Sequence, residues 1–97
     1  MKNANDLQKA GSELAKRFNG LTFEVKEKPY PESIIPWAKI VNSMWLLVNF
    51  NGCLFTSGRL NSEVENSIFD LHISDLNEEL EYFDKYNEFK PSEELPF

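Results

Sequence analysis

The fold is decided by residues 43–57, which read Ser-Met-Trp-Leu-Leu-Val-Asn-Phe-Asn-Gly-Cys-Leu-Phe-Thr-Ser. Two apolar runs flank an Asn-Gly pair at positions 51–52. This pair is the strongest short signal for a two-residue β-hairpin, because a type I′ turn requires positive φ at both central residues. We therefore predict an antiparallel hairpin in which Phe50 pairs with Cys53.

The register of this hairpin assigns each side chain to one of two faces of the sheet. In it Val48 pairs with Phe55, and successive residues along each strand point to opposite sides. The apolar face is predicted to pack on helices, whereas the other face is predicted to be partly exposed or partly covered. The first comprises Met44, Leu46, Val48, Phe50, Cys53 and Phe55, and the second comprises Trp45, Leu47, Asn49, Leu54 and Thr56.

An amphipathic helix is predicted near the N-terminus. Apolar residues recur there at helical spacing, Asn3 or Asn5 can cap the first turn, and Asn19-Gly20 is a typical stop signal. The apolar stripe consists of Leu7, Ala10, Leu14 and Phe18.

A half-buried strand is predicted to follow, because apolar and polar residues alternate from Leu21 onward. Pro29-Tyr30-Pro31 is expected to end it, since proline lacks the N–H that a strand ladder uses. Pro36 interrupts residues 32–41, which we interpret as a loop leading into a strand near Trp37.

The segment after the hairpin leaves two alternatives open. Ser62-Glu-Val-Glu65 has the form of a capping box and would start a helix. Phe69, Leu71 and Ile73 instead alternate with polar residues, as in a strand. Residues 64–73 can therefore be helix or strand on sequence grounds.

The last predicted element is a helix over residues 75–88, which Ser74 can cap. Leu76, Leu80 and Phe83 form its apolar stripe, and acidic residues occupy the rest of its circumference. These elements predict an α+β fold: an antiparallel β-sheet of about three or four strands with an N-terminal and a C-terminal helix packed on it.

The chain is expected to form a single small domain, residues 1–97, because 97 residues cannot bury two separate cores. Its tail, residues 90–97, contains two prolines and is expected to lie extended or to fray.

Charge is distributed unevenly along the chain, whose formal net charge is −6. Residues 1–59 hold eight basic and five acidic residues, a net +3, whereas residues 60–97 hold eleven acidic and two basic residues, a net −9. Such asymmetry indicates an acidic interaction surface or tail. A solvated helix that only keeps the protein in solution is the simpler alternative.

Catalysis is not expected. A nucleophilic site would have to use Cys53 and His72, the only residues of their kinds, and the sequence around Cys53 supplies neither a base nor an oxyanion hole. We interpret His72 as a surface or interface side chain. A single Cys and a single His exclude a structural zinc site within one chain, and Leu80 stands where a calcium loop would need glycine. No cofactor and no metal are therefore predicted.

The compartment is expected to be the cytoplasm. A lone cysteine cannot form an internal disulfide, which favours a reducing setting. The longest apolar stretch, residues 44–48, is too short to cross a bilayer, and the first residues lack the apolar core of a signal peptide.

The acidic residues indicate the chemistry of a partner. Helix residues three and four apart lie roughly 5 to 6 Å from one another, so carboxylates at this spacing form rows of charge near the spacing of DNA phosphates. They could occupy a cleft whose Lys and Arg normally bind DNA. Direct binding of nucleic acid by this acidic chain is not expected. The candidate partner-binding residues are Glu63, Glu65, Asp70, Asp75, Glu78, Glu79, Glu81, Asp84 and Glu88.

The short length, lone cysteine, absence of catalytic motifs and acidic Glu78-Glu79-Leu-Glu81-Tyr-Phe-Asp84 helix resemble the small phage-encoded anti-CRISPR proteins, in particular the DNA-mimic inhibitors of type I-F surveillance complexes. The resemblance spans the whole chain in size and charge plan. It implies a protein of the bacterial host cytoplasm whose acidic residues dock in the positively charged groove where target duplex DNA enters. DNA binding would be blocked there without any reaction.

Two other functions fit the same features. An immunity protein or antitoxin that neutralises a basic nuclease toxin also requires a small acidic domain, with exposed aromatic residues such as Tyr82 and Tyr86. The second is an adaptor whose acidic helix only confers solubility. The oligomeric state stays open, including a dimer through the face that carries Trp45.

Overall fold

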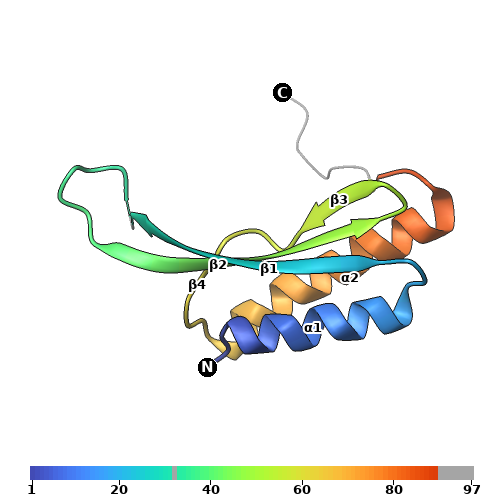
Figure 1. Ribbon diagram of the computed structural model, residues 1–97, viewed down its shortest axis with the longest axis horizontal. Coiled ribbons are helices and arrows are strands. Elements are labelled where there is room, and N and C mark those ends of the chain that lie inside the picture. The colour runs from blue at the N-terminus through green and yellow to red at the C-terminus, as the bar shows by residue number, and fades with distance from the viewer. Residues whose placement is uncertain (32, 90–97) are drawn as a thin grey trace.

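A four-stranded antiparallel sheet carries two helices on one of its faces (Figure 1). The computed structural model describes residues 1–31 and 33–89. Within them the chain forms, in order, α1 (Ala4–Arg17), β1 (Thr22–Pro31), β2 (Ile40–Phe50), β3 (Cys53–Thr56), β4 (Leu60–Asn61) and α2 (Asn66–Tyr86). The predicted α+β class is therefore confirmed. The predicted extended tail, residues 90–97, lies outside the described residues.

The hairpin between β2 and β3 forms as predicted. Its two turn residues, at 51–52, have φ of 53° and 81°, so both adopt the left-handed conformation that a type I′ turn requires. Phe50 pairs with Cys53, and Val48 pairs with Phe55. This register confirms the predicted division of side chains between two faces.

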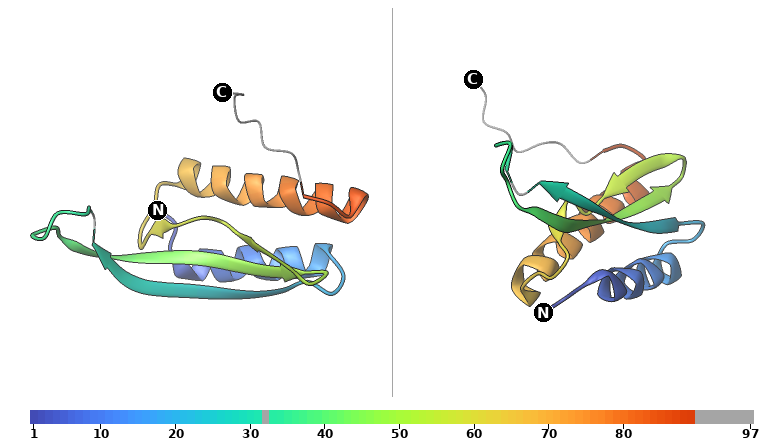
Figure 2. Two further views of the ribbon diagram at one scale, coloured as in Figure 1. Left: turned by 90° about the horizontal axis from the view of Figure 1, so that it is seen from above. Right: turned by 60° about the vertical axis from the view of Figure 1, so that its left-hand side comes forward.

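The apolar face of the sheet is buried beneath both helices (Figure 2). α1 packs against β1 and β2, and α2 packs against β3. Phe50 links the two helices, because its ring centroid lies 5.5 Å from that of Phe18 at the end of α1 and 6.2 Å from that of Phe83 in α2. The buried sheet residues on this face include Met44, Leu46, Val48, Phe50, Phe55 and Leu60, and Cys53 is half-buried.

β1 includes Pro29 and Tyr30 and ends at Pro31, the last of the three residues predicted to end it. Among the strands that the structure describes, β1 pairs only with β2 and is therefore an edge strand. Proline is tolerated at a sheet edge, because its missing N–H can face solvent. The following loop is also longer than predicted, because β2 begins at Ile40, beyond Trp37.

β1 and β2 extend past the helices as a two-stranded arm (Figure 1). Apolar side chains are exposed near its tip, including Ile34, Ile40 and Trp37, whose residue surface is 80% accessible. This apolar tip was not identified from the sequence, where the segment was interpreted only as a loop.

α1 has the predicted start. The side chain of Asn3 accepts a hydrogen bond from the N–H of Asn5 at 3.0 Å, and Asp6 accepts one from the N–H of Asn3 at 2.9 Å. This reciprocal arrangement satisfies donors that the first helical turn leaves unpaired. The predicted apolar stripe of Leu7, Ala10, Leu14 and Phe18 is buried.

α2 is one continuous helix of 21 residues from Asn66 to Tyr86, so of the open segment 64–73 all but the first two residues are helical. The proposed capping role of Ser62 is wrong, because Glu65 is the N-cap residue and no side-chain hydrogen bond caps the helix. The predicted start at Ser74 is also wrong, since that residue lies inside the helix. The buried stripe consists of Phe69, Leu76, Leu80 and Phe83.

Candidate functional site

α2 holds six of the nine candidate partner-binding residues on one rigid element. At about 1.5 Å per residue, a helix of this length spans roughly 30 Å. Because its apolar stripe faces the sheet, the acidic side chains lie on the solvent side, and all six residues are exposed. These are Asp70, Asp75, Glu78, Glu79, Glu81 and Asp84, while Glu63 and Glu65 precede the helix and Glu88 follows it. We call these nine residues the acidic face.

The first row of the acidic face lies beside α1. Asp70, Glu81 and Asp84 share one side of α2 with Asn77, because the four positions recur at intervals of seven, four and three residues. Arg17, the last residue of α1, identifies this side. Its guanidinium donates a hydrogen bond to Asn77 Oδ1 at 2.9 Å and forms an ion pair with Glu81.

Arg17 changes the charge of that row, because it offsets the carboxylate of Glu81. The two side chains are 53% and 49% exposed, so the ion pair contributes little to stability. The sequence indicates no partner for Glu81, because Arg17 lies 64 residues away along the chain. The position of Arg17 in the last turn of a predicted helix was the only local signal.

The second row mixes carboxylates with apolar side chains. Asp75 and Glu79 lie on the same side of α2 as four apolar or aromatic residues, at intervals of three or four positions. Leu71 and Tyr86 are 61% and 52% exposed, whereas Tyr82 is half-buried, so only Tyr86 is as exposed as expected. The four residues are Ile68, Leu71, Tyr82 and Tyr86. The acidic face is therefore not a continuous field of charge.

Glu88 continues neither row. Asn87 has a left-handed φ of 55°, and its N–H donates to the carbonyl of Phe83 at 2.8 Å, which ends α2 at Tyr86. The helix predicted over residues 75–88 therefore stops two residues early.

Glu63 and Glu65 lie at the opposite end of α2, and both are exposed. They flank Val64, whose backbone exchanges hydrogen bonds of 2.8 and 3.0 Å with the backbone of Lys2. This bridge ties the start of the chain to the start of α2. Glu65 also places a negative charge at the helix N-terminus, where the helix dipole favours it.

Cys53 and His72 do not form a pair. His72 Nδ1 lies 2.7 Å from the carbonyl oxygen of Ser57, and it is the donor because a carbonyl can only accept. Ser57 is four residues from Cys53, roughly 13 Å along an extended strand. His72 is half-buried and holds the segment after β3 against α2.

Comparison with protein-family models, curated proteins and solved structures gave no match. Within residues 1–31 and 33–89, no group of three or more His, Cys, Asp or Glu is placed to hold a metal ion. Neither helix of this part of the chain has the length and apolar character needed to cross a membrane.

Proposed function

We propose that this protein is a non-catalytic inhibitor that binds the positively charged DNA-binding groove of a CRISPR surveillance complex as a DNA mimic. It acts in the cytoplasm of a bacterial host and prevents target DNA from binding. The acidic face is the contact surface, and its carboxylates take the positions of DNA phosphates on the Lys and Arg side chains of the groove.

The observation that supports this function best is the exposure of every carboxylate of the acidic face along α2 and at its two ends. α2 itself carries about one carboxylate per 5 Å of axis, compared with one phosphate per 3.4 Å of each DNA strand. The carboxylates of α2 are thus more widely spaced than the phosphates of DNA. A groove that binds duplex DNA can still contact them along most of the helix.

The rigidity of α2 favours the same function. Its carboxylates are held by a helix that packs on the sheet, so binding orders few additional residues and costs little conformational entropy. Like charges three and four residues apart repel one another in the unbound protein. A basic partner relieves that repulsion.

The test reverses the two rows separately. Asp75→Lys with Glu79→Lys changes the second row, and Asp70→Lys with Asp84→Lys changes the first, while the Arg17–Glu81 pair stays intact. Each double variant should raise the concentration needed for half-inhibition of duplex binding by tenfold or more, because an attractive contact becomes repulsive. The measurement is an electrophoretic mobility shift in which the protein is added to a type I-F complex before the DNA, at several salt concentrations.

A matched control is available outside α2. Glu13→Lys with Glu27→Lys makes the same change in charge at exposed positions and should inhibit as the parent does. If the α2 variants fold, as judged by circular dichroism, and inhibit like the parent, the proposal is wrong. It is equally wrong if the control loses as much inhibition as they do.

An immunity protein against a basic nuclease toxin is the second candidate, and the exposed Leu71 and Tyr86 favour it. Apolar and aromatic anchors beside charged groups are typical of protein–protein interfaces, whereas a phosphate mimic has no use for them. Leu71→Ala with Tyr86→Ala separates the candidates in the same assay. The pair should leave inhibition of the CRISPR complex nearly unchanged, but should weaken binding to a toxin captured from host lysate by tenfold or more.

A further inference from the structure

The outer face of the sheet, opposite the helices, is uncovered by any element of the described chain (Figure 2). Alternation along paired strands places Lys26, Lys28 and Tyr30 of β1 on this face together with Trp45 and Leu47 of β2. Arg59 joins them from the segment between β3 and β4. We call the group Lys26, Lys28, Tyr30, Trp45, Leu47 and Arg59 the outer sheet patch.

Ring contacts hold this patch together. Tyr30 and Trp45 meet edge to face, with centroids 6.4 Å apart and ring planes at 73°. Arg59 Cζ lies 4.4 Å from the centroid of the Tyr30 ring, so the guanidinium is held against the aromatic ring. Two aromatic rings and a cation are thereby positioned on one surface before any ligand arrives.

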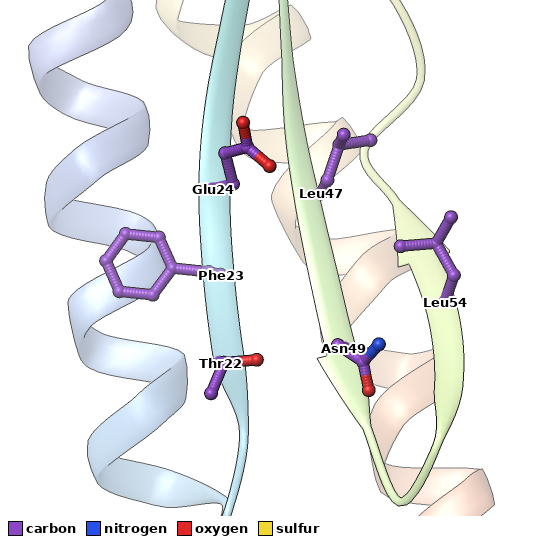
Figure 3. A pocket seen from close by; sticks show the side chains of 6 residues that line it. All are labelled: Thr22, Phe23, Glu24, Leu47, Asn49 and Leu54. Carbon is purple, nitrogen blue, oxygen red and sulfur yellow. The ribbon is translucent and has the colours of Figure 1, made fainter.

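Two hollows lie on this face, and the first adjoins the Trp45 ring. Lys26, Lys28, Trp45 and Leu47 line the first, which combines two ammonium groups with an indole wall. Leu47 also lines the second, where Phe23 points toward α1 and away from the other lining side chains (Figure 3). Leu47 lines both hollows, so they are neighbours on this face. The second hollow is lined by Thr22, Phe23, Glu24, Leu47, Asn49 and Leu54.

The acidic face lies on the other side of the sheet from this patch, because α2 packs on the opposite surface (Figure 2). A helix is about 10 to 12 Å across, more than the Debye length of about 8 Å at physiological ionic strength. The carboxylates of α2 therefore repel an anion at the patch only weakly. Glu24 is the one acidic residue at an outward position of the described strands.

The net charge of the chain opposes direct binding of nucleic acid, but the outer sheet patch is locally positive, and we propose that it binds single-stranded nucleic acid. Bases stack on Trp45 and Tyr30, and phosphates contact the three basic side chains. Aromatic rings interleaved with Lys and Arg on an open sheet suit a single strand, because each nucleotide offers both a flat ring and a negative charge. A duplex hides the faces of its bases, and an acidic peptide lacks regularly spaced rings, so either would use the cations alone.

Trp45 gives a direct readout of stacking. The chain has two tryptophans, so Trp37→Phe leaves Trp45 as the single tryptophan, whose fluorescence can be excited selectively over that of tyrosine. Titration with the oligonucleotide (dT)10 should quench its fluorescence as thymine stacks on the indole. At about −0.7 per phosphate contact on a single strand, three cations predict that log K falls with log salt with a slope of about −2.

Charge reversals within the same background test the cations. Lys26→Glu with Lys28→Glu should weaken (dT)10 binding by tenfold or more, and Arg59→Gln, which leaves β1 unchanged, should weaken it several-fold. Lys9→Glu with Lys16→Glu is the matched control on α1, with the same change in charge, and should bind as the parent does. Glu24→Gln should tighten binding, because it removes the one acidic residue of this face.

The proposal is overturned by any of four results. The first is the absence of quenching by (dT)10, and the second is a loss of affinity in the α1 control equal to that of the Lys26 and Lys28 variant. The third is an affinity for a duplex of ten base pairs equal to that for (dT)10. The fourth is the same equality for polyglutamate of matched charge. The last two would show that only the cations act. Because the site uses neither the acidic face nor its partner, its failure leaves the proposed function unaffected.

Discussion

The acidic face of α2 and the outer sheet patch lie on opposite sides of the sheet and carry opposite charge. Along the sequence, the same contrast appears only as a net charge of +3 for residues 1–59 and −9 for residues 60–97. Folding turns it into two separate surfaces, because the strands β1 and β2 form one layer and α2 forms the other. A formal net charge of −6 therefore describes neither surface, and each must be assigned a partner by its own chemistry.

The two surfaces also hold their charges differently. Exposed carboxylates of α2 project from a helix at intervals of three and four residues, which suits a partner that offers positive charge along a groove. On the sheet, the guanidinium of Arg59 is stacked on Tyr30, and two lysines flank Trp45. Cations next to rings suit a ligand that has both charge and flat surfaces.

The largest expected effect comes from the core between the two surfaces. Leu80 is fully buried where α2 packs on the sheet. Leu80→Ala should lower the free energy of unfolding by about 2 to 5 kcal/mol, because it removes buried methyl groups and leaves a cavity. Urea unfolding followed by circular dichroism measures the change.

Glu79→Ala is the matched control, one residue away on the exposed side of α2. It should change the free energy of unfolding by less than about 0.5 kcal/mol. Similar losses in the two variants would mean that α2 is not oriented with Leu80 toward the sheet, and the acidic face would not exist as described.

A smaller effect is expected at Gly11, where α1 approaches β1. A Cβ built on Gly11 would lie 2.3 Å from Cδ2 of Phe23, closer than real contacts allow, so the ring must shift. Gly11→Ala should therefore lower the free energy of unfolding by about 1 to 2 kcal/mol, although alanine favours the helix by about 1 kcal/mol. Thermal unfolding measures the loss. Ser12→Ala, at the exposed neighbouring position, should not lower the melting temperature.

Local sequence patterns were sufficient to predict much of this fold. The Asn-Gly pair specifies the hairpin between β2 and β3, because a two-residue turn fixes the register of both strands without help from the rest of the chain. The stripe of Leu76, Leu80 and Phe83 likewise follows from helical periodicity alone. The exposed positions of Asp75, Glu78, Glu79, Glu81 and Asp84 followed from the same stripe.

Features that depend on distant contacts could not be predicted in this way. Residues 64–73 alternate like a strand yet are mostly helical, because Phe69 packs into the core formed by the sheet and both helices. β1 runs through two prolines because it lies at an edge, which only the sheet order reveals. The pairing of Arg17 with Glu81 required the packing of α1 beside α2.

The smallest effect on stability is expected from Arg17→Gln. The same variant is the most sensitive test of the charge on the acidic face. The Arg17–Glu81 pair is about half exposed, so its loss should lower the free energy of unfolding by less than about 1 kcal/mol.

The variant Arg17→Gln also returns a full negative charge to the row beside α1. An exposed charge about 4 Å from an opposite one contributes about 1 kcal/mol in water, so half-inhibition of duplex binding should occur at a concentration up to about fivefold lower. Lys16→Gln makes the same change in net charge one residue away and should lower the half-inhibition concentration by less. Equal gains in the two variants would mean that net charge matters and the row does not, whereas weaker inhibition by Arg17→Gln would mean that Arg17 itself contacts the partner.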